Sequence, residues 1–413
     1  MWQRLLGMYL NRLIRVGSLS LTLPDGTTHH FGVPDAKAPT VGVAIHDTAT
    51  LRALALNPHL ALGESYMDQT LTIENDDLHG LLELAMRNIA AGHDSWLSRL
   101  RERVRDLSRG ISQRNQARRS KRNVAHHYDL SAKLYDLFLD ADRQYSCAYF
   151  RTPQDTLEQA QVQKKAHIAR KLLLKPGMSV LDIGCGWGGM GLTLAQEHGV
   201  KVLGVTLSEE QLKIARARAQ AAGLTDRVRF ELMDYRAVQG QFDRIVSVGM
   251  FEHVGAPNFQ TYFNTVNRLL AADGVALIHT IGRFTPPGST NPWITKYIFP
   301  GGYIPALSET AAAIERSGLI TTDVEIWRLH YAETLRHWYT RFMAQRDAAA
   351  ALYDDRFVRL WKFYLAASEQ TFRFAGQNVF QIQLARTVQT VPQTRDYLLR
   401  AQTTDHRLAS STR

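Results

Sequence analysis

The sequence has little cysteine and no long apolar run. Its two cysteines, Cys147 and Cys185, make no disulfide framework, which favours a reducing cytoplasm as the location. No apolar stretch approaches the length of a membrane span. Asn11, Arg12 and Arg15 interrupt the apolar N-terminus, so we expect an amphipathic helix there rather than a signal peptide. These absences argue against a disulfide-stabilised secreted domain and against a protein that spans a membrane.

Acidic side chains are scarce between residues 99 and 122, where ten Arg and Lys residues face only Glu102 and Asp106. The formal net charge of the chain is +10, and much of the excess lies in this segment. The segment also lacks aromatic residues, which single-stranded nucleic acids need as stacking platforms. We therefore expect it to bind anionic phospholipid head groups at a membrane surface rather than nucleic acid. A solvated linker is the alternative.

An apolar strand in the middle of the chain runs into a glycine turn. The predicted strand, 179–183, is followed by four glycines within six positions and then by a predicted helix at 190–198. Glycine lets the backbone N–H groups of such a turn come close to a nucleotide-like ligand. The turn alone is a weak signal, because glycine-rich turns are common.

Strands and helices alternate beyond this turn. We expect strands at 201–206, 228–233, 243–249 and 275–281, and helices at 208–222 and 258–270. This order predicts a parallel, doubly wound α/β sheet with its ligand at the carboxyl ends of the strands. Thr206, rather than an acidic residue, ends the second strand, and Asp182 lies inside the first. This arrangement favours an S-adenosylmethionine enzyme over a dinucleotide-dependent dehydrogenase.

A chain of 413 residues has room for two domains, because single cores stop growing at about 250–300 residues. In the first domain we expect a hairpin at 19–31, helices at 47–57 and 80–91, and a turn at 63–68. We divide the chain into an N-terminal lipid-docking domain at 1–98, a basic linker at 99–122, a larger α/β domain at 123–395 with an aromatic lid near 283–305, and a polar tail at 396–413.

Seven motifs stand out along the chain, and they are His127-Tyr128-Asp129, Tyr145-Ser146-Cys147-Ala148-Tyr149, Val180 to Gly189, Gly204 to Ser208, Val248 to Gly255, His279 to Gly282 and Pro292 to Pro300. Together they resemble the cyclopropane-fatty-acyl-phospholipid synthases and their mycolic-acid relatives. The similarity is close over residues 120–390 and looser over the N-terminal domain. The joint occurrence of these motifs is highly specific, whereas any single motif is not.

The resemblance implies a class I S-adenosylmethionine-dependent methyltransferase with a Rossmann-like, mostly parallel sheet and a smaller N-terminal α+β domain. It also implies a reaction, in which a cis double bond of a phospholipid acyl chain takes up the sulfonium methyl group and loss of a proton closes a cyclopropane ring. An alkene is a weak nucleophile, so the site must be dry and must align it behind the methyl group. Aromatic rings could stabilise the positive charge, and the lid offers Trp293, Tyr297, Phe299 and Tyr303.

The family resemblance further implies that the base is a bound bicarbonate. The resemblance implies that backbone groups of Cys147 and Ile281 position the ion. It also implies that His279 and Tyr331 donate hydrogen bonds to it. Glu252 then accepts from the bicarbonate hydroxyl or orients His279. The structural alternatives are a helix-capping role for Glu252 and a buried strand position for His279.

Ten residues match the cofactor-binding positions of the family: Tyr128, Tyr145, Ser146, Asp182, Gly184, Gly186, Thr206, Gln211, Asp234 and Tyr235. The resemblance places Gly184 and Gly186 beside the methionine and ribose, with Asp182 supporting the loop or the methionine ammonium group. Asp234 would accept from the adenine amino group, and Tyr235 would stack on its ring. We expect no metal, because the adjacent His126 and His127 do not face one another on a helix.

One position departs from the family. Many relatives carry a cysteine where this chain has Ser368. Direct methyl transfer needs no covalent enzyme intermediate, so we expect the change to be tolerated.

The predicted partners are an unsaturated phospholipid, an anionic membrane surface and a second copy of the chain. The resemblance suggests a homodimer through the N-terminal domain, and we expect a peripheral location at the inner face of the cytoplasmic membrane. Two alternative functions remain open. One is a fatty-acyl-phospholipid methyltransferase that makes methylene- or methyl-branched chains, and the other is a non-catalytic lipid-binding protein on the same fold.

Overall fold

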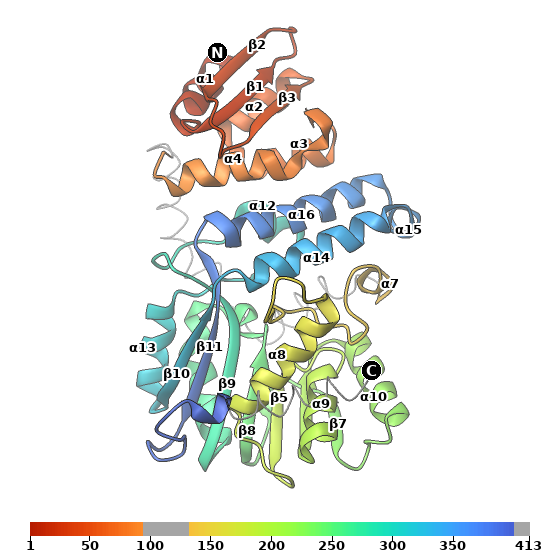
Figure 1. Ribbon diagram of the computed structural model, residues 1–413, viewed down its shortest axis with the longest axis vertical. Coiled ribbons are helices and arrows are strands. Elements are labelled where there is room, and N and C mark those ends of the chain that lie inside the picture. The colour runs from red at the N-terminus through yellow and green to blue at the C-terminus, as the bar shows by residue number, and fades with distance from the viewer. Residues whose placement is uncertain (94–131, 400–413) are drawn as a thin grey trace.

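A computed structural model describes residues 1–93 and 132–399. A small N-terminal unit lies above a layer of helices, and a larger α/β unit lies below that layer (Figure 1). The predicted basic linker at 99–122, Tyr128 and the chain beyond residue 399 lie outside the described residues.

The N-terminal unit contains a four-stranded sheet in the order β2-β1-β3-β4. Its elements are α1 (Trp2–Leu13), β1 (Gly17–Thr22), β2 (Thr28–Val33), β3 (Thr40–Ile45), α2 (Thr48–Leu56), α3 (Pro58–Met67), β4 (Leu71–Ile73), η1 (Glu74–Asp76) and α4 (Leu78–Ala90). The predicted hairpin is present, since β1 and β2 pair antiparallel around a turn closed by Leu23 N–H and Thr27 C=O at 2.8 Å. Alternation along β1 turns Leu19 and Leu21 into the core.

The turn predicted at 63–68 is wrong, because residues 58–67 form helix α3. Pro58 at the first helical position is compatible with this start, and the interior Gly63 has a packing reason. A Cβ at Gly63 would lie 2.4 Å from Nε1 of Trp293, a residue of the distant lid segment. The glycine therefore lets the N-terminal unit approach the lid closely.

The larger unit is built on a seven-stranded sheet in the order β10-β11-β9-β8-β5-β6-β7. Its first elements are α7 (Ala132–Asp136), α8 (Leu157–Lys171), β5 (Ser179–Ile183), α9 (Gly189–His198), β6 (Lys201–Thr206), α10 (Glu209–Ala221), β7 (Val228–Leu232), η2 (Tyr235–Ala237), β8 (Phe242–Val248), η3 (Phe251–His253), η4 (Ala256–Asn258), α11 (Phe259–Leu269) and β9 (Leu270–Arg283). Strands β5 to β9 run parallel, as predicted.

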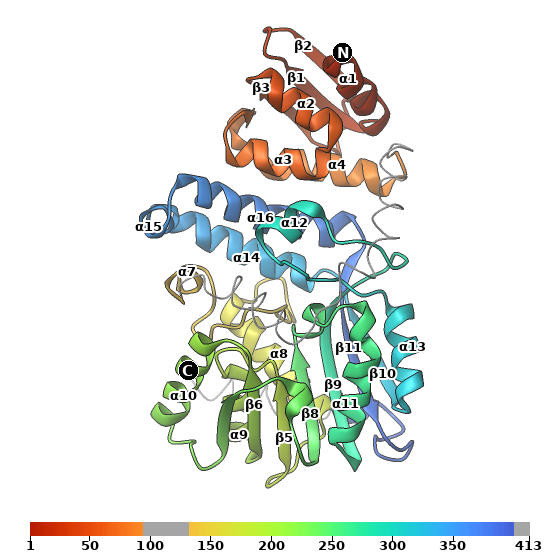
Figure 2. The ribbon, with the colours of Figure 1, turned by 180° about the vertical axis from the view of Figure 1, so that it is seen from behind.

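The remaining elements are α12 (Pro292–Tyr297), α13 (Leu307–Ser317), β10 (Ile320–Trp327), α14 (His330–Ala344), α15 (Arg346–Leu352), α16 (Asp355–Phe374) and β11 (Gln377–Ala385). The antiparallel strands β10 and β11 were not predicted. Gln381 and Gln383 of β11 are fully buried, so the strand lacks the apolar run that marks a central strand. The two faces of the sheet carry separate cores, with α8, α9 and α10 on one face and α11 and α13 on the other (Figure 2).

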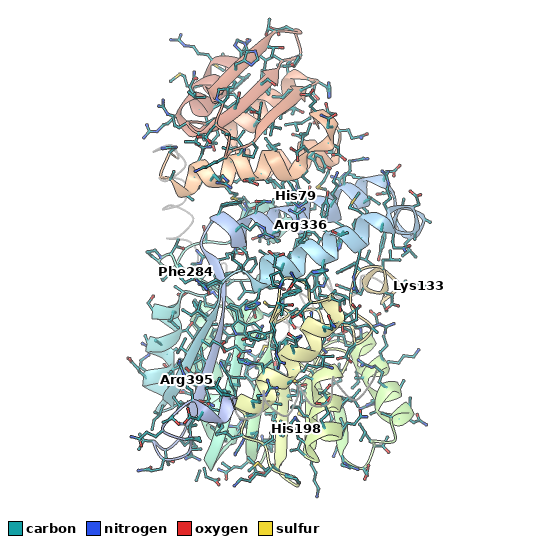
Figure 3. The ribbon with its side chains drawn as sticks, in the orientation of Figure 1. His79, Lys133, His198, Phe284, Arg336 and Arg395 are labelled. Carbon is teal, nitrogen blue, oxygen red and sulfur yellow. The ribbon has the colours of Figure 1, made fainter. Side chains whose placement is uncertain are left out.

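Helices α14 and α16 pack against each other and separate the sheet from the N-terminal unit, and α16 also packs against α4 (Figures 1 and 2). His79 of α4 contacts Glu369 of α16 at 3.2 Å, and Arg336 and Arg373 pair with the same fully buried carboxylate. His79 and Arg336 lie at the boundary between the two units (Figure 3). One continuous apolar cluster includes residues from both sides of this boundary. The N-terminal unit is therefore packed onto the helical layer rather than tethered to it.

Candidate active site

The glycine turn after β5 forms one wall of a cavity at the carboxyl ends of the parallel strands. The φ angles of Gly184, Gly186 and Gly188 are +82°, +54° and +85°, a region that favours glycine. The N–H groups of Gly184 and Cys185 both donate to Val205 C=O, at 2.9 and 3.0 Å. A Cβ at Gly186 would have no atom within 4 Å, so the backbone at this point faces open space.

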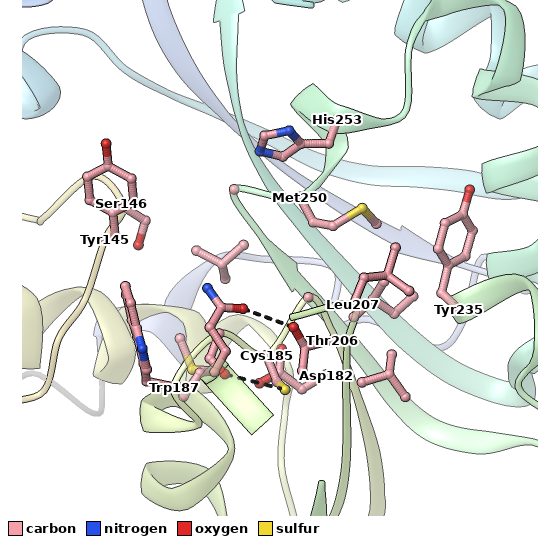
Figure 4. A pocket seen from close by; sticks show the side chains of 18 of the residues that line it. Tyr145, Ser146, Asp182, Cys185, Trp187, Thr206, Leu207, Tyr235, Met250 and His253 are labelled. Carbon is pink, nitrogen blue, oxygen red and sulfur yellow. Dashed lines mark hydrogen bonds between the residues drawn. The ribbon is translucent and has the colours of Figure 1, made fainter. Parts of the chain in front are cut away.

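The structure brings nine of the ten predicted cofactor residues to this cavity, whose empty space, counted with its open mouth, is about 1210 Å³. They are Tyr145, Ser146, Asp182, Gly184, Gly186, Thr206, Gln211, Asp234 and Tyr235. Thr206 donates to Oε1 of Gln211 at 2.9 Å, and Ser208 caps α10 through Gln211 N–H. Tyr145, His253 and Tyr235 surround the hollow above Asp182 and Thr206 (Figure 4).

Asp182 is the buried acidic group of this cavity. Only 1% of the residue is exposed, and its Oδ2 has no hydrogen-bond partner in the described chain. Burial raises the pKa of the carboxyl to about 7, although a backbone hydrogen bond from Gly191 opposes the rise. An unpaired buried carboxylate oxygen beside an open glycine backbone fits a cationic, nucleoside-containing ligand such as S-adenosylmethionine.

A buried lysine that the sequence analysis missed supports the wall opposite the glycine turn. Lys164 of α8 is fully buried and donates to Gln144 Oε1 at 2.7 Å and to Ser146 Oγ at 2.8 Å. Burial lowers the pKa of its ammonium group to about 7. The only signal in the sequence is a lysine on the inward face of an amphipathic helix, which resembles an ordinary surface lysine.

A second, larger cavity of about 2310 Å³ lies between the helical layer and the N-terminal unit. Ile281, Tyr331 and Tyr364 line it on the side of the sheet, and Leu19 and Leu84 are among its residues from the N-terminal unit. That figure includes the open mouth of the cavity. The part wide enough for a water molecule, about 490 Å³, lies within the roughly 300–1,000 Å³ of ligand pockets and gives room for a long apolar ligand.

The two cavities approach each other at three pairs of residues. Ile281 N–H donates to Glu252 Oε1 at 2.6 Å, next to His253 of the first cavity. The hydroxyl groups of Tyr145 and Tyr364 lie 2.9 Å apart, and these residues line different cavities. The rings of His253 and Phe299 lie 5.9 Å apart, edge to face. We call the space between these pairs the junction.

Of the five predicted catalytic residues, two line the second cavity and Glu252 lies at the junction, but the five do not all contact one another. Ile281 and Tyr331 line the second cavity, and Cys147 belongs to the same apolar cluster. Glu252 is buried, its Oε2 has no hydrogen-bond partner, and burial raises its pKa to about 7. His279 is bonded to Gln381 at 3.0 Å rather than to Glu252.

Burial also holds the pKa of His279 well below its usual value, so the ring is neutral. Burial raises the pKa of the Cys147 thiol, which keeps it protonated. Cys147 is consequently unsuited to nucleophilic attack.

The four aromatic residues of the lid have different surroundings. Trp293 and Phe299 line the second cavity. The hydroxyl of Tyr297 donates to Glu64 at 2.8 Å at the domain boundary, and that of Tyr303 donates to Glu309 at 2.5 Å. Trp293 and Phe299 are therefore the two of the four that are placed to meet a ligand.

Comparison with known proteins connects this geometry to a family. A family model described as mycolic acid cyclopropane synthetase matches residues 115–382, well over half of the chain. The chain belongs to this family. Residues 8–94 match a separate domain family of unknown function. As a member of the synthetase family, the protein is an S-adenosylmethionine-dependent methyltransferase with the class I fold that the sequence predicted.

Two relatives are similar to this synthetase family member over almost its whole length. The cyclopropane-fatty-acyl-phospholipid synthase of Escherichia coli is 38% identical over 89% of this chain and 96% of that protein. The tuberculostearic acid methyltransferase of Mycobacterium tuberculosis is 38% identical over 91% of this chain and 90% of that protein. The protein is thus a lipid-modifying enzyme, and the two relatives differ in the product that they are named for.

A crystal structure of a mycolic acid cyclopropane synthase complexed with SAH and CTAB matches with a TM-score of 0.61 and 34% identity. The match covers 64% of this chain and 97% of the other, so that structure corresponds to the catalytic part alone. Within residues 1–93 and 132–399 of this family member, no helix is both long and apolar enough to cross a bilayer. The same residues contain no cluster of His, Cys, Asp and Glu that could hold a metal ion.

Proposed function

We propose that the protein transfers the methyl group of S-adenosylmethionine to a cis double bond of a phospholipid acyl chain and closes a cyclopropane ring. The observation that carries this proposal is the junction, where a cavity with exposed glycine backbone and buried polar groups meets a mainly apolar cavity suited to an acyl chain. Two part-buried pairs, Tyr145–Tyr364 and Glu252–Ile281, line the junction.

The residues of the first cavity have the chemistry to hold the methyl donor. S-adenosylmethionine would supply an electrophilic sulfonium methyl group when bound there. Asp182 would accept from its ammonium group, since Oδ2 is buried and lacks a partner. Lys164 holds Ser146 and Gln144, and through them the loop segment that lines this wall of the cavity. This segment would exclude water from the reacting atoms, which a weak alkene nucleophile requires.

Glu252 is the group that this chain offers for proton handling. Its Oε1 is held by Ile281 N–H, whereas its buried Oε2 is open to a hydrogen-bond donor. A bicarbonate hydroxyl fits that acceptor, and the ion when bound would supply the basic oxygen for the final deprotonation. Ile281 N–H already binds Glu252, so it could position the ion only by sharing that hydrogen bond. The neutral His279 and the hydroxyl of Tyr331 remain candidate donors to it.

The N-terminal unit offers a surface for docking on a membrane. Helix α1 buries Leu6 and Leu13 but exposes Leu5 and Met8 by 45% and 61%, and Met1 before the helix is 83% exposed. Arg4 and Arg12 lie on the same helix, as in amphipathic helices that bind anionic lipid. The positive charge of the basic segment 99–122 would add electrostatic attraction to an anionic membrane.

The reaction is tested by incubating the protein with S-adenosylmethionine, bicarbonate and vesicles of a cis-monounsaturated anionic phospholipid. Proton NMR of the extracted lipid should show the high-field signals of a cyclopropane ring. Unmodified lipid in every such incubation would refute the proposed substrate class. In buffer freed of CO₂ the rate should fall, and added bicarbonate should restore it.

A second product class has support from the tuberculostearic acid methyltransferase. That relative is 38% identical to this chain, the same identity as the cyclopropane synthase. Loss of a different proton after methyl transfer gives a methylene-branched chain. Both products gain the same mass, so only NMR separates them. Vinylidene proton signals without cyclopropyl signals would establish this alternative and reject ring closure.

A further inference from the structure

The second cavity has a wall of mixed origin. The catalytic unit contributes the junction residues and the lid, while α1, β1 and α4 of the N-terminal unit contribute the far side. Leu13, Leu19, Leu21 and Leu84, which are 4% exposed or less, lie on that far side. The cavity therefore extends from the junction to the core of the N-terminal unit.

Unfilled space that is lined mainly by apolar side chains is costly. Protein interiors are normally filled to the density of organic crystals, and unfilled apolar volume destabilises a core by about 24 cal/mol per Å³. The second cavity, here called the chamber, opens toward the reacting centre. It is therefore better explained as a place for a ligand than as a packing defect.

Polar and apolar side chains line different sides of the chamber. Its polar side chains from the lid and from the start of β11 lie on the catalytic side, and they are Arg283, Thr285, Ser289, Thr290, Asn291 and Gln377. The side formed by the N-terminal unit is mainly leucine. A phospholipid whose double bond lies at the junction has its ester and phosphate on one side of the reacting carbons and its methyl end on the other. Polar groups must be hydrogen-bonded when they leave water, so the ester side belongs with the lid and the methyl end with the leucines.

We propose that the interior of the N-terminal domain receives the methyl-terminal end of the reacting acyl chain, and that its depth selects the length of that end. This proposal rests on the proposed function, because it assumes that an acyl-chain double bond reacts at the junction. It assigns to the N-terminal domain a role in substrate selection in addition to membrane docking. The catalytic unit of the mycolic acid synthase structure has no matched counterpart of this domain, so the leucine-lined wall is an addition to that unit.

A test fills the chamber without touching the junction. Ala85 of α4 is half-buried and lines the chamber, whereas Ala90 of the same helix is exposed and does not. Ala85→Phe should shorten the chamber, and Ala90→Phe is the matched control. Met86 also lines the chamber, so Met86→Ala should deepen it. Thermal melting of each variant verifies that it folds.

The substrates are phosphatidylglycerols with one constant palmitoyl chain and one reacting chain. Oleoyl and palmitoleoyl chains have the double bond at the same distance from the ester, but oleoyl is longer on the methyl side. A cis-vaccenoyl chain has the methyl side of palmitoleoyl and a longer ester side. Incorporation of labelled methyl from S-adenosylmethionine measures the rate for each lipid, whichever final product forms.

We expect Ala85→Phe to lower the oleoyl rate at least tenfold relative to both palmitoleoyl and cis-vaccenoyl, and Ala90→Phe to leave the ratios unchanged. Met86→Ala should shift the ratio in favour of oleoyl, which keeps the test decisive if Ala85→Phe does not fold. Equal losses on all three lipids would overturn the proposal. So would selectivity that follows the length of the saturated chain in a second lipid series, because the chamber would then hold the other acyl chain. If the wild-type protein methylates none of these lipids, the proposed function fails instead.

Discussion

The cavity beside the glycine turn takes its wall from residues 143–258, whereas the second cavity takes its wall from residues between 6 and 377. The first is built on consecutive strand ends and their loops, with backbone exposed at glycines and a few buried polar groups. The second is built from apolar side chains on both sides of a domain boundary. A donor that is the same in every reaction can be held by fixed backbone, while a lipid substrate that varies in length needs a wall of adjustable side chains.

The largest predicted effect breaks the first cavity and leaves the second intact. Gly186→Val should abolish measurable binding of S-adenosylmethionine in calorimetry, because the new side chain would enter the open space beside the turn at a φ of +54°. Gly177→Val is the control, since Gly177 has a φ of +84° at the other end of β5. It should lose stability but keep binding. Equal loss of binding in both variants would mean that backbone strain, not the cavity, is responsible.

The next effect concerns the junction. Glu252→Gln should lower kcat by about 10²–10⁴, the usual contribution of a general acid–base group, while S-adenosylmethionine still binds. Glu197→Gln, at an exposed position, is the control. The pKa of Glu252 is about 7 and its ionised form is the acceptor, so the wild-type rate should fall as pH drops below about 7. A variant with the wild-type rate and the same pH profile would remove Glu252 from the mechanism.

A smaller effect tests how the first cavity is closed. Lys164→Met should weaken binding of S-adenosylmethionine by roughly 10–100-fold, since hydrogen bonds to a charged group contribute about 1.5–3 kcal/mol. The physical reason is that Gln144 and Ser146 lose their common partner. Lys213→Met on the exposed side of α10 should have no effect. An unchanged dissociation constant for Lys164→Met would show that the segment closes the cavity without the lysine.

The smallest effect concerns the contact between the two cavities. Tyr364→Phe removes the hydroxyl that lies 2.9 Å from that of Tyr145, and it should lower kcat by about two- to tenfold, the value of one hydrogen bond. Binding of S-adenosylmethionine should change less than kcat, because Tyr364 lines only the second cavity. Tyr353→Phe, on the exposed part of the helical layer, is the control. A change confined to binding would place this contact in the first cavity alone.

The sequence was sufficient for the parts that depend on neighbouring residues. The glycine turn, the five parallel strands and the start of α10 at its cap Ser208 follow from local backbone preference and from alternation of apolar residues. The family motifs lie on these same elements, so the residues of the first cavity could be named. Strand β11 was not predicted because its buried glutamines interrupt the apolar pattern of a central strand. Helix α3 was mistaken for a turn because its interior Gly63 is needed for the close approach of Trp293, which lies far away in the sequence.

Only the tertiary structure decided the rest. Lys164 has a function because α8 carries it beneath Ser146, and Glu252 has an unpaired oxygen because Ile281 N–H engages the other one. The second cavity is a gap between surfaces that lie far apart in the sequence, and no local pattern encodes a gap. Local sequence determines how each segment folds, whereas an enclosed volume depends on how folded segments fail to fill the space between them.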